Sequence, residues 1–185
     1  MGSSWKRGLL MEEMRGFLRK KKNCKVVATD FSSNALQQLK EASERDSTTE
    51  KVFPVVADAR ALPIGEPKSI DAVYSRSALH LTDGELDQFF EECVLLLKDS
   101  GYIMIEGKTE DDPKVAASKE VSPHLYENGG GHLRRLWNEA IIQDLIQKHK
   151  LTLIEMNKTS EIWDQIETKF INFIAQKQHE NEPAA

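Results

Sequence analysis

The pattern of apolar and polar positions predicts alternating helices and short buried strands along the chain. Apolar residues recur at helical spacing from Trp5 to Leu18, which predicts an opening amphipathic helix. Further helices are expected over residues 33–43, after Thr82 and after Asn138. Strands are expected where short apolar runs occur, over residues 25–29, 52–57, 70–75, 102–106, 151–156 and 170–175. This order predicts an α/β fold with a mostly parallel sheet and an antiparallel pair of strands at the end of the chain.

Three local signals sharpen these boundaries. Thr82 and Glu85 have the spacing of a capping box, in which each side chain binds a backbone N–H at the start of a helix. Asn138 is expected to cap the helix that follows it. Pro54 lacks a backbone donor, so the strand over residues 52–57 should lie at a sheet edge.

Residues 108–135 are predicted to be mostly loop, because the segment is acidic and contains Pro123 and three successive glycines. A loop of this length is either a disordered connection or an active-site lid. His124, Tyr126 and His132 could form a substrate lid, and a mobile surface loop is an equal alternative.

Composition limits the classes of function. The 185 residues fit one domain, expected over residues 1–177 with a polar tail over 178–185. The balance of 25 basic against 30 acidic residues argues against a nucleic-acid surface. Cys24 and Cys93 lack the spacing of metal ligands, so no metal site is expected. No apolar stretch approaches the ~20 residues that cross a membrane, and no signal peptide is evident, so a cytoplasmic protein is expected.

Two carboxylates end successive apolar runs. Asp30 follows the run 26–29, and Asp58 follows the run 55–57. Carboxyl ends of parallel strands form the edge at which open α/β sheets bind nucleotides. A carboxylate there can accept the hydroxyls of a ribose, and Phe31 offers a flat apolar face to a base. The alternative for Asp30 is that it only caps the following helix.

In these residues the chain resembles the class I S-adenosylmethionine-dependent methyltransferases. The resemblance rests on Val26–Ser32, Ala57–Pro63, Ser69–Ser75, Ala78–Leu81, Leu95–Tyr102 and Phe170–Lys177. It implies a Rossmann-like sheet in the strand order 3-2-1-4-5-7-6, with strand 7 antiparallel and strand 3 at an edge, which agrees with Pro54.

The chain departs from this family at its beginning. The family's first strand and glycine-rich loop have no counterpart, since Gly2–Ser4 is at most the tail of such a loop. Three outcomes are open. The strands on either side of the gap pair directly, a partner chain or second copy donates a strand, or the chain is a truncated form.

The resemblance implies S-adenosylmethionine as the cofactor and assigns it to five residues. Asp30 would accept hydrogen bonds from the ribose hydroxyls, and Phe31 would pack on the adenine. Asp58 would accept the adenine amino group, and the backbone N–H of Ala59 would meet a ring nitrogen. Ser75 would lie near the methionine part.

No catalytic residue is assigned, because methyl transfer needs a base only when the acceptor must lose a proton. His80 is one candidate base, and local packing or hydrogen bonding is the favoured interpretation. The predicted function is methyl transfer to a small molecule or a protein. The alternative is a catalytically inactive methyltransferase-like module, in a truncated form, that acts through protein–protein interaction. A nicotinamide-dependent oxidoreductase is a third possibility that fits the end of the chain poorly.

Overall fold

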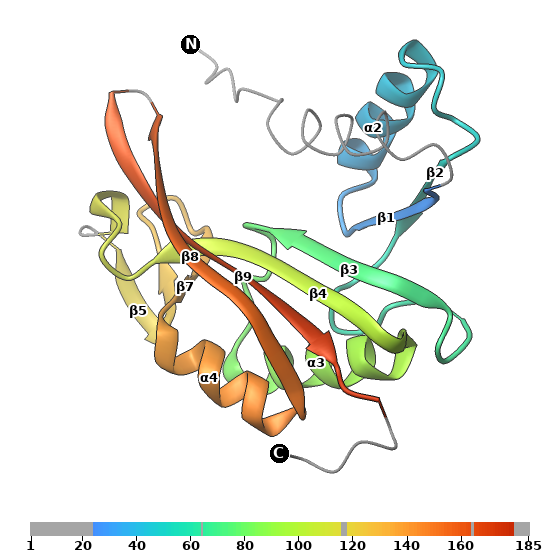
Figure 1. Ribbon diagram of the computed structural model, residues 1–185. Coiled ribbons are helices and arrows are strands. Elements are labelled where there is room, and N and C mark those ends of the chain that lie inside the picture. Colours follow the sequence, from blue (N-terminus) through green and yellow to red (C-terminus); the bar gives the residue numbers. More distant parts are fainter. Residues whose placement is uncertain (1–23, 64, 116–117, 164, 180–185) are drawn as a thin grey trace. The chain divides into compact units, whose positions relative to one another are not determined.

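The computed structural model describes residues 24–63, 65–115, 118–163 and 165–179, and the chain divides into two compact units (Figure 1). The first unit is Met1–Leu62 and the second is Pro63–Ala185. The opening helix expected between residues 5 and 18 and the glycine-loop remnant at residues 2–4 lie outside the described residues. A single methyltransferase-like domain over residues 1–177 stays a prediction.

The first unit contains a β-α-β arrangement, as predicted. Strand β1 (Val26–Asp30) pairs in parallel with β2 (Val52–Val56), and α2 (Ser33–Arg45) connects them. Burial drives this packing, because Leu36 and Leu39 of α2 form a small core with Val52. Strand β2 has β1 as its only described neighbour, so Pro54 lies in an edge strand, which confirms that prediction.

The second unit is built on a mixed sheet. Strand β3 (Ile70–Arg76) pairs in parallel with β4 (Leu97–Thr109). Antiparallel to β4 runs β9 (Ile166–Lys177), which also pairs with β8 (Leu151–Trp163). The predicted α/β class and the antiparallel pair at the end of the chain are confirmed, although the strands are longer than predicted.

Helices α3 (Asp83–Leu96) and α4 (Glu139–Lys148) lie side by side along one face of this sheet (Figure 1). The capping box of Thr82 and Glu85 is present in full, as predicted. Asn138 caps α4, because its Oδ1 accepts the backbone N–H of Ile141 at 2.9 Å. Apolar residues at helical spacing along α3 are buried, at Leu86, Phe89, Phe90, Cys93 and Leu96.

The prediction of a loop over residues 108–135 is wrong in its main part. After a short 3₁₀ helix (Pro113–Val115), the segment forms an antiparallel meander of β5 (Lys119–Ser122), β6 (Leu125–Glu127) and β7 (Leu133–Trp137). Strand β7 then joins the end of β4 in parallel. Three to five residues are too few to show a period of two, and the proline and glycines that suggested a loop form the turns of the meander.

Two further expectations concern the sheet. Strand β4 begins at Leu97, five residues earlier than predicted. The three outcomes for the missing first strand stay predictions, because they concern strands of the two separate units. No helix within the described ranges is long and apolar enough to cross a membrane.

Candidate functional site

The parallel pairing of β1 and β2 brings two acidic residues to one edge of the first unit. Asp30 ends β1 opposite Val56, and Asp58 follows two residues after the end of β2. The N–H of Ala57 donates to the carbonyl oxygen of Asp30 at 3.0 Å, which extends the pairing beyond the strands. Asp30, Phe31, Asp58 and Ala59 therefore lie along the same carboxyl edge, where such sheets bind ligands.

One oxygen of Asp30 is engaged and the other is available. Its Oδ1 accepts the backbone N–H of Ser32 at 2.8 Å. Ser32 itself caps α2, since its hydroxyl accepts the N–H of Ala35, so Asp30 supports the helix start without being its cap. No hydrogen bond reaches Oδ2 from the described residues. Next to it, Phe31 is 85% exposed, which is unusual for an apolar ring and leaves its face free to pack on a base.

Asp58 is already occupied by its neighbour Arg60. Its Oδ1 accepts the backbone N–H and the Nε–H of Arg60, both at 2.9 Å, and its Oδ2 pairs with Nη2. These hydrogen bonds and the charge of Arg60 lower the pKa of Asp58 to about 2. The backbone N–H of Ala59 donates no hydrogen bond within the described chain. The available carboxylate oxygen, the exposed ring and this N–H suit an adenosine, whereas Asp58 becomes available only when Arg60 moves.

Ser75 and His80 belong to the second unit. Ser75 is half-buried one residue before the end of β3, so it is not among the four residues brought together on the first unit's edge. His80 accepts the N–H of Arg135 at Nδ1 and faces Nη1 of Arg134 with Nε2. Burial and the charge of Arg134 lower its pKa to about 4. Because both ring nitrogens face donors, His80 is poorly placed as a base, which favours the structural interpretation.

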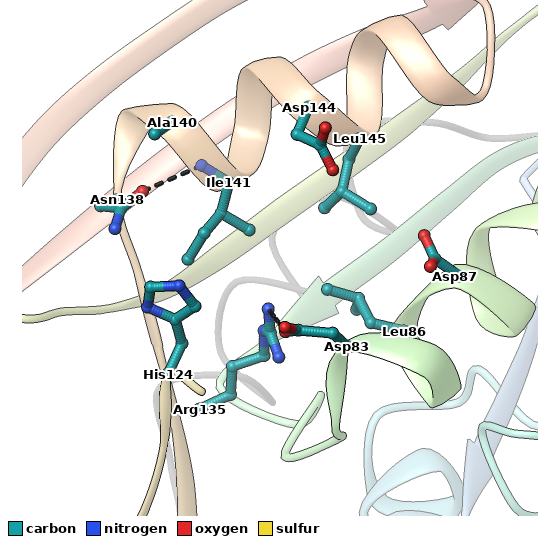
Figure 2. A pocket seen from close by; sticks show the side chains of 10 residues that line it. All are labelled: Asp83, Leu86, Asp87, His124, Arg135, Asn138, Ala140, Ile141, Asp144 and Leu145. Carbon is teal, nitrogen blue, oxygen red and sulfur yellow. Dashed lines mark hydrogen bonds and ion pairs between the residues drawn. The ribbon is translucent and has the colours of Figure 1, made fainter. Parts of the chain in front are cut away.

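The second unit contains a pocket of about 300 Å³ between α3, α4 and the meander (Figure 2). Its apolar part is formed by Leu86, Ala140, Ile141 and Leu145. Its polar part is formed by Asp83, Asp87, His124, Arg135, Asn138 and Asp144. An apolar floor with a few convergent polar groups is typical of small-molecule sites.

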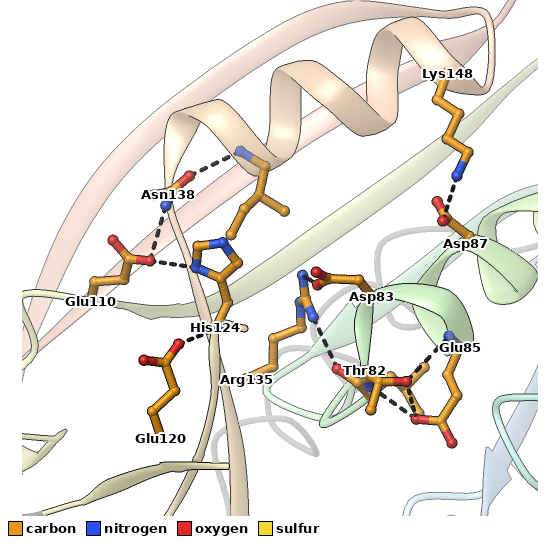
Figure 3. Close-up of polar contacts among 12 residues, drawn as sticks. Thr82, Asp83, Glu85, Asp87, Glu110, Glu120, His124, Arg135, Asn138 and Lys148 are labelled. Atoms are coloured by element: carbon orange, nitrogen blue, oxygen red, sulfur yellow. Dashed lines mark hydrogen bonds and ion pairs between the residues drawn. The ribbon is translucent and has the colours of Figure 1, made fainter. Parts of the chain in front are cut away.

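Most polar groups of this pocket are fixed by ion pairs (Figure 3). The buried guanidinium of Arg135 pairs with Asp83 at 2.7 Å and donates to the carbonyl oxygen of Leu81 at 3.0 Å. Asp87 pairs with Lys148 on α4. These contacts tie the start of α3 to β7 and to the end of α4, so the walls of the pocket are held in position.

Of the three histidine and tyrosine residues proposed for a lid, His124 lines the pocket. Its Nδ1 lies 2.8 Å from Oε1 of Glu110, and the same oxygen accepts Nδ2–H of Asn138 at 3.0 Å. Tyr126 lies in β6 and His132 is exposed next to the turn between β6 and β7. Glu110 was not identified from the sequence, and its only signal was an acidic stretch shortly before a histidine.

Comparison with known proteins identifies a family for this chain and solved structures with a similar fold. A family model described as "Methyltransferase domain" matches residues 7–105. A search of curated proteins finds no significant match. Among solved structures, the chain is similar to a SAM-dependent methyltransferase from Methanosarcina mazei, with a TM-score of 0.70 and 15% identity, covering 89% of this chain and 87% of that one.

Two further structures have the same fold. A protein from Pyrococcus horikoshii matches with a TM-score of 0.68 and 20% identity, covering 88% of this chain and 76% of that one. The 1,6-didemethyltoxoflavin-N1-methyltransferase of Burkholderia thailandensis, solved with 1,6-didemethyltoxoflavin and S-adenosylhomocysteine, matches with a TM-score of 0.64 and 15% identity. That match covers 96% of this chain and 82% of the Burkholderia chain. At these identities the similarity concerns the fold.

Proposed function

The chain belongs to the methyltransferase domain family, whose cofactor is S-adenosylmethionine, and on this premise we propose that it methylates a small-molecule or protein acceptor. The observation that carries the proposal is the carboxyl edge of the first unit. There Asp30 keeps one carboxylate oxygen without a hydrogen bond in the described chain, next to the exposed ring of Phe31.

Each residue of that edge has a role in holding the adenosine half of the cofactor. Asp30 accepts hydrogen bonds from the ribose hydroxyls through Oδ2, and Phe31 packs on the adenine. Ala59 donates its backbone N–H to a ring nitrogen, and Asp58 accepts the adenine amino group once Arg60 has moved away. Ser75, on the second unit, contributes to the methionine half. Because methyl transfer is an in-line displacement, these residues contribute mainly by positioning.

Calorimetric titration with S-adenosylmethionine tests the proposal. Asp30→Ala should weaken binding roughly 10- to 100-fold, because hydrogen bonds to a charged acceptor contribute about 1.5–3 kcal/mol each. Glu44→Ala is the matched control, since it removes an exposed acid from α2 of the same unit and should leave the affinity unchanged. Equal affinities for Asp30→Ala and the wild type would contradict the assignment of this edge.

The ion pair between Arg60 and Asp58 occupies a carboxylate that the cofactor would need. It therefore favours a second candidate function, an inactive module that acts through protein–protein interaction. In that case folded protein gives no heat with millimolar cofactor, and light scattering shows a dimer or a stable complex. Cofactor binding by a monomer would exclude this candidate.

A further inference from the structure

We infer that the methyl acceptor is an amine bound in the pocket between α3 and α4, with His124 as the base that removes its proton. The inference rests on the proposed function and deepens it by naming the acceptor class and a catalytic residue. It is carried by the pocket itself, by the contact of His124 with Glu110, and by the acidic side chains around the pocket.

The pocket lies at the functional edge of the second unit. Strands β3, β4 and β7 are parallel, and α3 and α4 begin shortly after β3 and β7 end. The starts of both helices therefore lie toward the carboxyl edge of the strands, which is the edge where open α/β sheets bind ligands. His124 and the residues around Asn138 line the pocket at this end (Figure 2).

The contact between His124 and Glu110 fixes the protonation of the ring. A carboxylate can only accept a hydrogen bond, so the imidazole Nδ1 that lies 2.8 Å from Glu110 carries hydrogen. In the neutral ring, Nε2 then keeps the lone pair that a base needs. Asn138 orients Glu110 in turn, donating to the same Oε1 while its own Oδ1 caps α4 (Figure 3). A base oriented by a carboxylate is a recurrent catalytic arrangement.

The backbone also holds His124 in place at some cost. Its φ of +59° lies in the left-handed region, which few residues other than glycine adopt. Two hydrogen bonds maintain this conformation: the N–H donates to Glu120 at 3.0 Å, and the carbonyl oxygen accepts the N–H of Leu136 at 2.8 Å. Strained residues held by their surroundings are concentrated at functional sites.

The charge of the pocket selects a cation. Asp83 and Asp87 are paired with Arg135 and Lys148, whereas Asp144 makes no hydrogen bond or close ion pair with the described residues and only feels the charge of Lys148 at longer range. Three carboxylates line the pocket against two paired cations, so an anionic acceptor is disfavoured and an ammonium group can pair with Asp144. The apolar floor then accommodates the carbon skeleton attached to the amine.

The chemical step balances with these residues. The bound ammonium gives a proton to Nε2 of His124 and becomes a neutral amine. The nitrogen lone pair forms a bond to the methyl carbon as the bond from that carbon to sulfur breaks. The sulfur keeps the electron pair, so the products are S-adenosylhomocysteine and a methylated ammonium, and the imidazolium returns its proton to solvent.

Ligand-observed NMR of the whole chain tests the acceptor class without turnover, with benzylamine, benzyl alcohol and benzoate as matched cationic, neutral and anionic probes. Benzylamine should bind best. The Asp144→Asn variant should weaken the binding of benzylamine roughly five- to tenfold and leave the binding of benzyl alcohol unchanged. Asp71→Asn is the control, because Asp71 is an exposed acid on β3 outside the pocket. Equal binding of the three probes, or equal effects of the two variants, would overturn the inference.

A methylation assay tests the role of His124 as the base. The variant is His124→Gly, because glycine tolerates the positive φ at this position. Wild-type protein should methylate members of a primary-amine panel. The variant should lose roughly 10²–10⁴-fold in kcat, bind benzylamine as before, and recover activity with added imidazole. A loss of kcat that imidazole does not restore, or an effect on benzylamine binding alone, would overturn the role of His124.

The acceptor class has its own contradicting outcome. Cofactor binding without methylation of any amine would overturn it, whereas absence of cofactor binding would count against the proposed function itself.

Discussion

Arg60 and Asp58 illustrate how one side chain controls a site at the residue scale. Arg60 occupies both oxygens of the carboxylate that the family resemblance assigns to the adenine. The pair is solvent-exposed, and exposed ion pairs are weak, so a ligand can displace Arg60 at small cost. Arg60 lowers the pKa of Asp58, and an aspartate carboxylate without that partner is still charged at neutral pH, so Asp58 can accept the adenine amino group after Arg60 is displaced.

Arg60→Ala should therefore bind S-adenosylmethionine more tightly than the wild type, by roughly two- to fivefold, because the competing ion pair is lost. Calorimetry under the same conditions as for Asp30→Ala measures the change. Removing the positive charge of Arg60 also reduces the long-range repulsion of the cationic cofactor, which by itself favours binding. Arg45→Ala, which removes an exposed arginine from α2, is the control for that effect. Weaker binding by Arg60→Ala would show that Arg60 itself contacts the ligand.

The helix α3 shows how a distant residue can complete an element. Lys177, at the end of β9, is only 8% exposed, and its Nζ donates to the carbonyl oxygens of Val94 and Leu97 at 2.8 and 3.0 Å. These carbonyls lie at the carboxyl end of α3, where a positive charge also complements the helix dipole. Lys177 thus caps α3 from a strand 80 residues later in the chain.

Lys177→Met should lower the free energy of unfolding by about 2–3 kcal/mol, since it leaves buried carbonyl oxygens without a donor. Urea denaturation followed by circular dichroism measures the loss. The control is Lys158→Met, because Lys158 is 63% exposed and its pair with Glu139 should contribute little. Equal denaturation midpoints for the two variants would contradict the capping role.

The elements that sequence predicted well are those whose signals are local. The capping box and apolar stripe of α3 lie within 15 residues, and the acids at Asp30 and Asp58 each end an apolar run. The meander over residues 119–137 was missed because its strands are shorter than a recognisable period. The contact between Glu110 and His124 was missed for another reason. It joins residues 14 positions apart, and no spacing rule predicts it before the course of β6 and β7 is known.

At the scale of the whole molecule, His80 couples folding to pH. Its imidazole is half-buried and faces donors from β7, so the folded state disfavours the protonated form and lowers the pKa from 6.5 to about 4. Above pH 6.5 the ring is neutral in both the folded and the unfolded state, and its contribution is fully present. As the pH falls below 6.5, the unfolded chain takes up a proton that the folded chain does not. Stability is therefore lost progressively between pH 6.5 and pH 4.

The loss should reach about 3 kcal/mol near pH 4, since one pKa unit corresponds to about 1.4 kcal/mol. Urea denaturation at a series of pH values between 7 and 4 measures it, with His80→Gln as the comparison. The variant should be less stable than the wild type at pH 7, because glutamine cannot reproduce the packing of the ring, but its stability should change less between pH 6.5 and pH 4. The substitution leaves every other ionisable side chain in place, so the difference between the two curves isolates His80. Parallel curves would mean that the ring reaches solvent and accepts a proton in the folded protein, and His80 would then again be a candidate base for the proposed methyl transfer.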